Sequence, residues 1–348
     1  MTEFTARATM RGWARRPSAG RRIAGVVLIA VLLVEIVLAA PYFGGAMSDL
    51  YRSNLRWLAL AVVAQLLSIS AFARGQNRLL SAGGAHVPTR RMVAMTYIAN
   101  ALSVSLPGGV AWSNGYVFRR LRSWGATVPA AGFTILASAV LSTLSFALLA
   151  LVCAVLAGSG GLSSLAVIGG AAIVAIAALI IRRHHKPDLL IRLASRALTR
   201  ANRALRRAPD AGLAGLRTAI GELSAIEPRN RDWLAAFSFA ELNWIADLAC
   251  LVACFHAVGG SGSSLILATA AYIAGKAASS LSLLPGGLGV VDAAMIFALT
   301  QGGVSTLSAA AIVLLYRLIS LALVVALGWL ILAITWTGDR RRAARAGS

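Results

Sequence analysis

Ionisable side chains occur at six positions inside the long apolar runs of this 348-residue sequence: Glu35, Glu241, Asp247, Lys276, Asp292 and Arg317. Insertion scales assign about 2.5–3.5 kcal/mol to one charged residue at the centre of a membrane helix. Six unpaired charges are therefore too costly, and we expect ion pairs or a water-filled cavity to relieve them. The chemistry open to such groups is the binding of a charged ligand within the apolar region, and buried basic side chains suit a phosphate.

Lys276 and Asp292 lie on either side of the tripeptide Pro285-Gly286-Gly287. A helical hairpin that turns at this tripeptide brings the two side chains to a similar depth in the membrane. We therefore predict that Lys276 and Asp292 form an ion pair.

Arg317 lies roughly 16 Å into the last apolar run at 1.5 Å per residue. In an earlier run, Asp247 has a comparable depth, and Asn243 lies one turn before it on the same helical face. We predict that Arg317 pairs with Asp247 or with Glu241. Two interpretations remain open: the pairs lock helices together, or Lys276 and Arg317 contact a lipid phosphate.

The composition indicates that the elements carrying these residues cross a membrane. Hydrophobic residues make up 58% of the chain and charged residues 13%, whereas a soluble domain is about one-quarter charged. The net charge of +21 comes from arginines at the ends of the apolar runs. No basic surface with aromatic residues for base stacking accompanies them, so we expect no nucleic-acid partner. Their distribution predicts a multi-pass protein of the cell (inner) membrane with both termini in the cytoplasm.

The apolar runs predict an all-α polytopic membrane protein with about six full spans, at residues 23–40, 55–73, 128–157, 165–181, 233–258 and 307–336. Two membrane halves, 23–181 and 233–336, are joined by a basic linker at 182–232, and residues 1–22 and 337–348 form basic cytoplasmic ends. Arginines recur in the linker at three- and four-residue spacing, which predicts an amphipathic helix. This helix either lies on anionic lipids of the inner leaflet or is a solvated connector.

Two tripeptides, Pro107-Gly108-Gly109 and Pro285-Gly286-Gly287, interrupt apolar runs whose arms are too short to span the bilayer comfortably. We predict a re-entrant helical hairpin at each, the first entering from the cytoplasm and the second from outside. The two halves then form an inverted repeat, from which many secondary transporters build a midplane site. The helix N-termini freed by each break suit a phosphate, and the alternative is a structural kink.

The residues of the second hairpin resemble a known family. The run Leu284-Pro285-Gly286-Gly287-Leu288-Gly289-Val290-Val291-Asp292-Ala293-Ala294, followed by Leu315-Tyr316-Arg317-Leu318-Ile319, is similar to the lysylphosphatidylglycerol synthase transmembrane family, the flippase-like group. The similarity extends from about residue 55 to residue 336, and the family usually has Glu where this chain has Asp292. The resemblance implies lipid translocation, or a related role with polar-headed or polyprenyl lipids. It implies no synthase chemistry, because the chain has no room for the soluble aminoacyl-transferase domain of the full-length synthases.

Three functions remain open. The first is a flippase-like protein that binds or translocates an anionic phospholipid or polyprenyl phosphate lipid. The second is a lipid-linked glycosyl or aminoacyl transferase, which usually needs carboxylates on a metal or a nucleotide-binding loop; we find neither motif and expect no enzyme, metal or cofactor. The third is a non-transporting partner of a lipid-modifying complex.

Overall fold

The computed structural model of the chain describes residues 54–106, 108–156, 187–204, 208, 210, 212–224, 226–259, 265–281, 285–287 and 289–346. All regular elements in these ranges are helices. The predicted spans 23–40 and 165–181 lie outside the described residues, as do Glu35 and Pro107.

Within the described ranges, four helical stretches are long and apolar enough to cross a membrane. They are α3 (Leu55–Ala82), α6 (Val128–Leu156), α10 (Asn230–Ala257) and one continuous helix made of α13 (Thr306–Arg317), the π-helical segment η3 (Leu318–Leu323) and α14 (Val324–Ala346). A helix of 28 residues, such as α3, is about 42 Å long and exceeds the ~30 Å hydrocarbon core. The prediction of an all-α polytopic membrane protein is confirmed.

The helix α3 continues past the predicted end of its span at residue 73. Arg74 and Arg78 lie within the helix, because arginine is a good helix former. The chain turns only after Ala82, at Gly83 and Gly84, where Gly84 has a φ of +85° that glycine adopts without steric cost.

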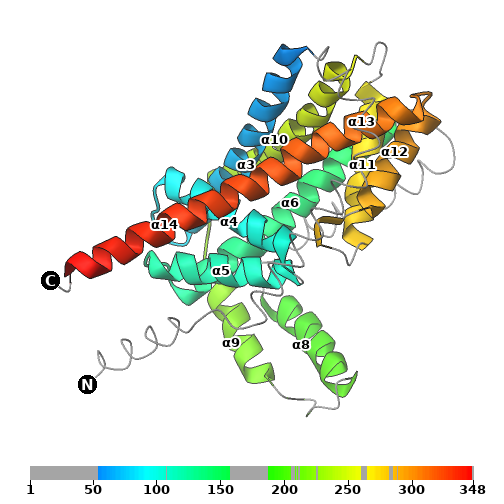
Figure 1. Ribbon diagram of the computed structural model, residues 1–348. Coiled ribbons are helices and arrows are strands. Elements are labelled where there is room, and N and C mark those ends of the chain that lie inside the picture. Colours follow the sequence, from blue (N-terminus) through cyan, green and yellow to red (C-terminus); the bar gives the residue numbers. More distant parts are fainter. Residues whose placement is uncertain are drawn as a thin grey trace.

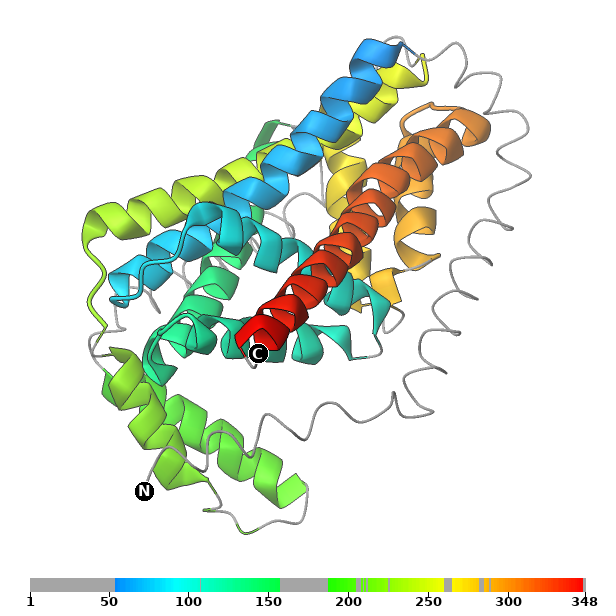
Figure 2. The same cartoon turned by 60° about the vertical axis from the view of Figure 1, so that its left-hand side comes forward.

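The helices α3 and α10 pack against each other and run in opposite directions (Figures 1 and 2). Trp57 near the start of α3 stacks on His256 near the end of α10, with ring centroids 4.5 Å apart. Midway along both helices, the Ser68 hydroxyl donates a 3.1 Å hydrogen bond to Asn243 Oδ1. Each of these two residues lies 13 positions after the first residue of a 28-residue helix. Ser68 and Asn243 therefore occupy equivalent positions in the two halves, near the middle of each helix.

Each Pro-Gly-Gly tripeptide separates two short helices. The first pair is α4 (Thr89–Ser105) and α5 (Gly109–Ser123); the second is α11 (Leu265–Leu281) and α12 (Val290–Gln301), with the 3-10 helix η2 (Pro285–Gly287) between them. The longest arms have 17 residues and extend only about 26 Å, less than the hydrocarbon core. Gly108 and Gly286 have φ values of +66° and +67°, a left-handed conformation that favours glycine.

Each hairpin packs on a long helix of the other half. The arm α4 packs on α14 and on η2, whereas α11 packs on α6 (Figure 1). Gly328 permits the close approach of α14, since a Cβ atom there would overlap the carbonyl oxygen of Tyr97 in α4. This exchange of partners, together with antiparallel α3 and α10, is the arrangement expected of an inverted repeat.

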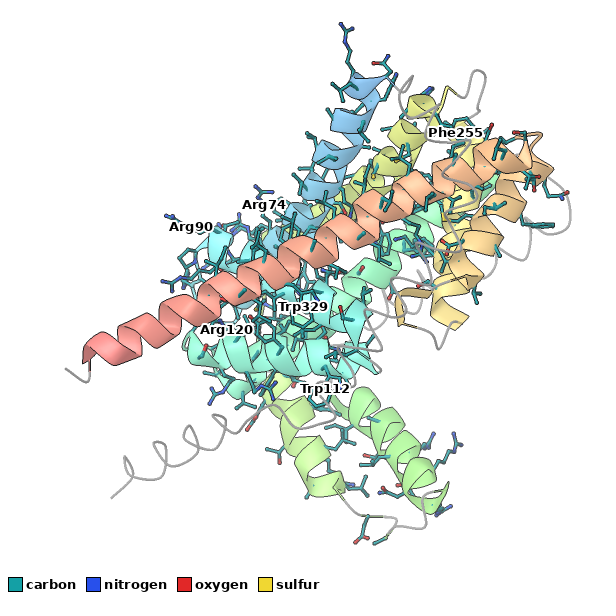
Figure 3. All side chains as sticks on the ribbon, viewed as in Figure 1. Arg74, Arg90, Trp112, Arg120, Phe255 and Trp329 are labelled. Atoms are coloured by element: carbon teal, nitrogen blue, oxygen red, sulfur yellow. The ribbon has the colours of Figure 1, made fainter. Side chains whose placement is uncertain are left out.

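The predicted amphipathic linker helix is present as α8 (Pro187–Ala204), and it is followed by α9 (Leu213–Ser224), which packs on α8 and α6. The exposed positions of α8 include four arginines: Arg192, Arg196, Arg200 and Arg203. Further arginines gather at one end of the bundle, where Figure 3 shows Arg74, Arg90 and Arg120, while Phe255 lies at the opposite end. The basic residues are thus concentrated on one side of the spans, as the positive-inside rule describes.

Candidate functional site

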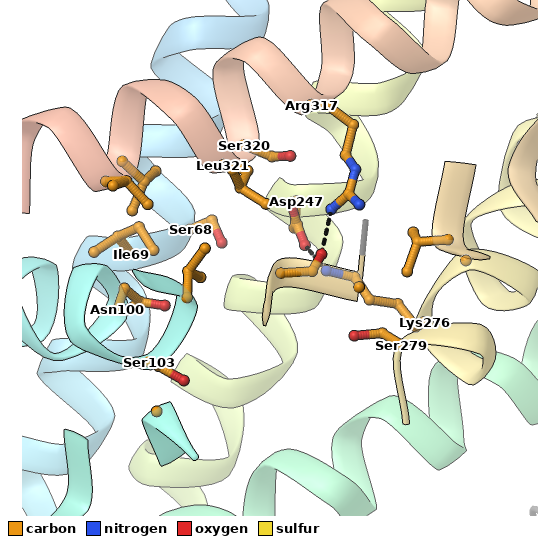
Figure 4. A pocket seen from close by; sticks show the side chains of 18 of the residues that line it. Ser68, Ile69, Asn100, Ser103, Asp247, Lys276, Ser279, Arg317, Ser320 and Leu321 are labelled. Atoms are coloured by element: carbon orange, nitrogen blue, oxygen red, sulfur yellow. Dashed lines mark hydrogen bonds and ion pairs between the residues drawn. The ribbon is translucent and has the colours of Figure 1, made fainter. Parts of the chain in front are cut away.

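A cavity of about 1080 Å³ lies where the two hairpins meet the α3–α10 pair (Figure 4). Its volume is slightly above the ~300–1,000 Å³ typical of small-molecule pockets. The predicted site residues that line it are Gly108, Gly109, Asn243, Asp247, Lys276, Gly286, Gly287 and Arg317. Both halves of the chain therefore contribute to one cavity.

Asp247 is a buried acceptor on α10, with 7% of its surface exposed. Its Oδ2 atom accepts hydrogen bonds from Lys276 Nζ at 2.7 Å and from the Tyr272 hydroxyl at 2.8 Å. Its Oδ1 atom accepts a 3.1 Å hydrogen bond from the Tyr316 hydroxyl. Tyr272 and Lys276 are one turn apart on α11, so both reach the same carboxylate. These three donors tie α10 to α11 and α13.

Lys276 is stabilised at the cavity wall by two aromatic rings as well as by Asp247. Its Nζ atom lies 5.0 Å from the ring centroid of Tyr272 and 5.4 Å from that of Trp244, within the range of cation–π attraction. Trp244 is itself fixed, because its Nε1 atom donates a 2.9 Å hydrogen bond to the Ser142 carbonyl of α6. The ammonium group therefore has a defined position.

Arg317 ends α13 and reaches the turn of the second hairpin. Its Nε atom donates a 2.6 Å hydrogen bond to Asp292 Oδ1, and its Nη1 atom donates a 3.0 Å hydrogen bond to the Gly286 carbonyl. Its Nη2 atom is buried and has no hydrogen-bond partner among the described residues. The π-helical segment η3 begins at the next residue, and such segments often occur at functional sites.

The predicted ion pairs are wrong in their partners: Lys276 pairs with Asp247, and Arg317 pairs with Asp292. Depth in the membrane does not determine which side of a helix a residue faces. Asp292 is the third residue of α12, and its Oδ2 atom accepts a 3.0 Å hydrogen bond from the Gly289 amide. This local bond holds the carboxylate at the hairpin turn, which Arg317 also contacts.

Glu241 and Asp292, which the structure describes, do not line the cavity. The side chain of Pro285 lies outside the described part of the structure. Asp292 is connected to the cavity through its ion pair with Arg317, which does line it. Glu241 Oε1 on α10 and Ser145 Oγ on α6 are both buried without a hydrogen-bond partner in the described part of the chain. The predicted alternative pair of Arg317 with Glu241 is therefore not formed.

The turn of the first hairpin brings backbone groups to the cavity. A Cβ atom at Gly109 would overlap the carbonyl oxygen of Ser103, so only glycine permits this close return of the chain. The helix α5 begins at Gly109, and its N-cap residue Gly108 provides no side-chain hydrogen bond. The partial positive charge of this helix N-terminus therefore lies at the cavity.

Sequence reasoning missed the uncharged polar residues of the lining: Gln65, Ser68, Asn100, Ser103, Asn114 and Ser279. A signal was present for two of them, because Asn100 and Asn114 repeat the positions of charged residues in the other half. Asn100 and Lys276 each lie 11 positions after the first residue of a 17-residue helix. Asn114 and Asp292 each lie five positions after the last glycine of a Pro-Gly-Gly tripeptide. Tyr272 and Tyr316, which donate to Asp247, were also missed.

The fold and the cavity define a multi-pass membrane protein in which two broken-helix hairpins enclose a charged internal space. The family model described as the lysylphosphatidylglycerol synthase TM region matches residues 22–328, and the chain belongs to this family. The resemblance seen in the second hairpin is confirmed, and family membership connects this integral membrane protein with the handling of membrane lipids. A search of curated proteins finds no match to the chain.

Proposed function

We propose that this protein binds the phosphate of an anionic or polyprenyl-linked lipid in the cavity and translocates the lipid headgroup across the membrane. The observation that carries this proposal is the Nη2 atom of Arg317, which is buried and has no partner within the described ranges. A buried charged donor without an acceptor costs free energy, and a phosphate oxygen is an acceptor of suitable charge and geometry. Asp292 and Gly286 hold the other nitrogens of the guanidinium in place.

The charges and apolar residues of the lining support a lipid ligand. Lys276 and Arg317 line the cavity, and each is paired with one carboxylate, Asp247 and Asp292. The donor that remains for an anionic ligand in the described lining is therefore the Nη2 atom of Arg317. Apolar side chains of α3 and α14, including Ile69 and Val324, line the same cavity. A ligand with a phosphate and a hydrocarbon part matches both kinds of surface better than a soluble anion does.

The inverted repeat supports movement of the ligand. Hairpins of opposite direction meet at one cavity, which is the arrangement in which alternating access operates around a central site. In this proposal the arginine-rich end of the bundle faces the cytoplasm of a cell membrane, with both termini on that side. The arginines of α8 then contact anionic lipids of the inner leaflet.

Translocation is tested with the full chain reconstituted in proteoliposomes that contain labelled phosphatidylglycerol or a labelled polyprenyl phosphate. We expect the wild-type protein to exchange label between leaflets faster than empty liposomes do. Replacing the guanidinium in Arg317→Gln should lower this rate by about 10- to 100-fold, since a hydrogen bond to a charged group contributes about 1.5–3 kcal/mol. Arg317→Lys, which keeps the charge but not the fork of donors, should give an intermediate rate.

Arg90→Gln is the matched control, because Arg90 is exposed at the start of α4 and does not line the cavity. It should leave the rate unchanged, and the melting temperature of each variant in detergent reports whether it folds. The proposal fails if wild-type protein gives no acceleration for any anionic lipid tested. It also fails if a folded Arg317→Gln variant transports as fast as Arg90→Gln.

A further inference from the structure

The carboxyl group of Glu241 lies between α10 and α6, outside the cavity. Its Oε1 atom is shielded from solvent and has no hydrogen-bond partner among the described residues. The side chain of Ser145 on α6 faces this carboxyl, is fully buried, and likewise has no partner for its hydroxyl in the described part of the chain. Glu241 lies 11 positions after the first residue of α10, or about 16 Å along this membrane-spanning helix. The carboxyl is therefore well inside the apolar region.

No cation on the described helices that pack on α10 is placed to neutralise an ionised Glu241. The helix α6 carries no Asp, Glu, Lys, Arg or His. The cations of α11 and α13 are paired with other carboxylates, Lys276 with Asp247 and Arg317 with Asp292. The arginines of α3 are all exposed, and the other titratable side chains of α6, α11 and α13 are uncharged thiol or phenol groups: Arg56, Arg74 and Arg78; Cys153, Tyr272 and Tyr316. A negative charge on Glu241 would thus be uncompensated within the membrane, where unpaired charges are costly.

Glu241 lies directly beside the cavity although it does not line it. Trp244 follows Glu241 by one turn on α10, and Ser142 precedes Ser145 by one turn on α6. Trp244 and Ser142 both line the cavity, and they are joined by the 2.9 Å hydrogen bond from the indole Nε1 atom to the serine carbonyl. One contact between α6 and α10 therefore forms the cavity wall, and the next encloses the carboxyl.

A phosphate in the cavity and an ionised Glu241 would repel each other. Lys276 and Arg317 are each paired with a carboxylate, so a bound phosphate adds a net negative charge to this region. Like charges in surroundings of low dielectric constant disfavour each other, and protonation of the carboxyl removes this repulsion. Binding of the proton and binding of the phosphate then strengthen each other by the same factor, because linkage is reciprocal.

We propose that Glu241 is a proton-binding site and that one proton moves with each lipid headgroup through the protein. Hydronium on one side of the membrane gives a proton to the Glu241 carboxylate and leaves water, and the neutral carboxyl returns the proton to water on the other side. This inference rests on the proposed function and adds its energy source, a proton gradient. A carboxyl that only holds α6 against α10 through Ser145 would give lipid binding no dependence on pH.

Equilibrium binding of phosphatidylglycerol to the full chain in detergent, measured from about pH 5 to about pH 9, tests the linkage. Phosphatidylglycerol is a suitable probe because its phosphodiester stays ionised while carboxyl groups titrate. We expect the wild-type affinity to fall as the pH rises, by up to about tenfold per pH unit where Glu241 ionises, since one proton is linked to one lipid.

Glu241→Gln resembles the protonated acid and should lose this dependence on pH. Glu222→Gln is the matched control, because Glu222 is exposed on α9 and should keep the full dependence. The melting temperature of each variant in detergent reports whether it folds.

Two further measurements follow the proton itself. The infrared difference between wild type and Glu241→Gln should contain a carboxylic acid band that converts to carboxylate as the pH rises. Ser145→Ala should keep this band but shift its frequency. In proteoliposomes with the membrane potential clamped, a gradient of one pH unit should concentrate trace labelled phosphatidylglycerol about tenfold in the leaflet on the alkaline side, since one proton per lipid transfers a tenfold ratio. Glu241→Gln should abolish this accumulation.

The inference is overturned if wild-type affinity for phosphatidylglycerol is the same at every pH, or if folded Glu241→Gln keeps the wild-type dependence. It is also overturned if Glu241→Gln removes no titrating carboxyl band. Arg317→Gln distinguishes these outcomes from failure of the proposed function. Binding that needs Arg317 but ignores pH refutes the proton linkage alone, whereas a wild-type protein that binds neither phosphatidylglycerol nor a polyprenyl phosphate at any pH refutes the proposed function and this inference with it.

Discussion

Removing the Asp247 carboxylate by Asp247→Ala should destabilise the bundle more than removing any exposed carboxylate. Asp247 is 7% exposed and accepts hydrogen bonds from Lys276, Tyr272 and Tyr316. Its loss leaves a cation and two hydroxyl groups without their acceptor at the centre of three helices. The two tyrosine hydroxyls belong to two different helices that pack on α10, namely α11 and α13. Loss of the carboxylate therefore weakens the packing among three helices of the second half.

The magnitude follows from the burial of the pair. Breaking a buried ion pair by removing one partner costs about 3–5 kcal/mol. The Lys276 side chain is 32% exposed, and water screens that part of its charge, which favours the lower end of the range. In a chain of this length 1 kcal/mol corresponds to roughly 2 °C in melting temperature. We therefore expect Asp247→Ala to lower the melting temperature by about 6 °C.

Thermal unfolding of the detergent-solubilised protein, followed by tryptophan fluorescence, measures this shift. The control is Asp232→Ala on the same helix, where Asp232 Oδ2 accepts a 3.3 Å hydrogen bond from the Arg229 amide at the helix start. Loss of that cap costs about 1 kcal/mol, so a shift of about 2 °C is expected. Asp247→Asn keeps an acceptor for the tyrosines and should fall between the two.

A double-mutant cycle with Lys276→Met determines whether the ion pair is the cause. If it is, the double variant Asp247→Ala/Lys276→Met should be more stable than the sum of the single effects by about 1–3 kcal/mol, because no unpaired cation remains. An additive cycle, together with an Asp247→Ala shift no larger than that of Asp232→Ala, would refute the reasoning.

The remaining predictions concern glycines at close backbone contacts. Gly109→Ala should lower the melting temperature, since its Cβ atom would overlap the Ser103 carbonyl at the hairpin turn; the expected cost is about 1–3 kcal/mol. Gly328→Ala should have a similar effect by forcing α14 away from the Tyr97 carbonyl of α4. Gly115→Ala in α5 has open space around its Cβ position and should be neutral or stabilising by up to about 1 kcal/mol. Equal melting temperatures for all three variants would contradict the packing described for the hairpins.

The sequence alone determined the features that depend on local chemistry. Apolar runs longer than the hydrocarbon core become helices in any arrangement of the bundle, and arginines mark their ends. Pro-Gly-Gly breaks a helix because proline lacks an amide hydrogen and glycine permits a positive φ, as Gly108 and Gly286 show. The ionised residues of the site were found for the same reason, because a charge in an apolar run is visible without knowledge of its neighbours.

Only the tertiary structure decided which of these groups meet. The sequence indicates how deep a residue lies in the membrane, but it does not show which of several residues at that depth will be its partner. The rotation and crossing of the helices determine the contacts. Lys276 faces Asp247 because Tyr272 and Lys276 share the face of α11 that packs on α10, whereas Asp292 is held at the hairpin turn by the Gly289 amide. The same packing turns Gln65 into the cavity and Glu241 out of it. Local propensities set the helices and their breaks, but the packing of side chains between helices sets the site.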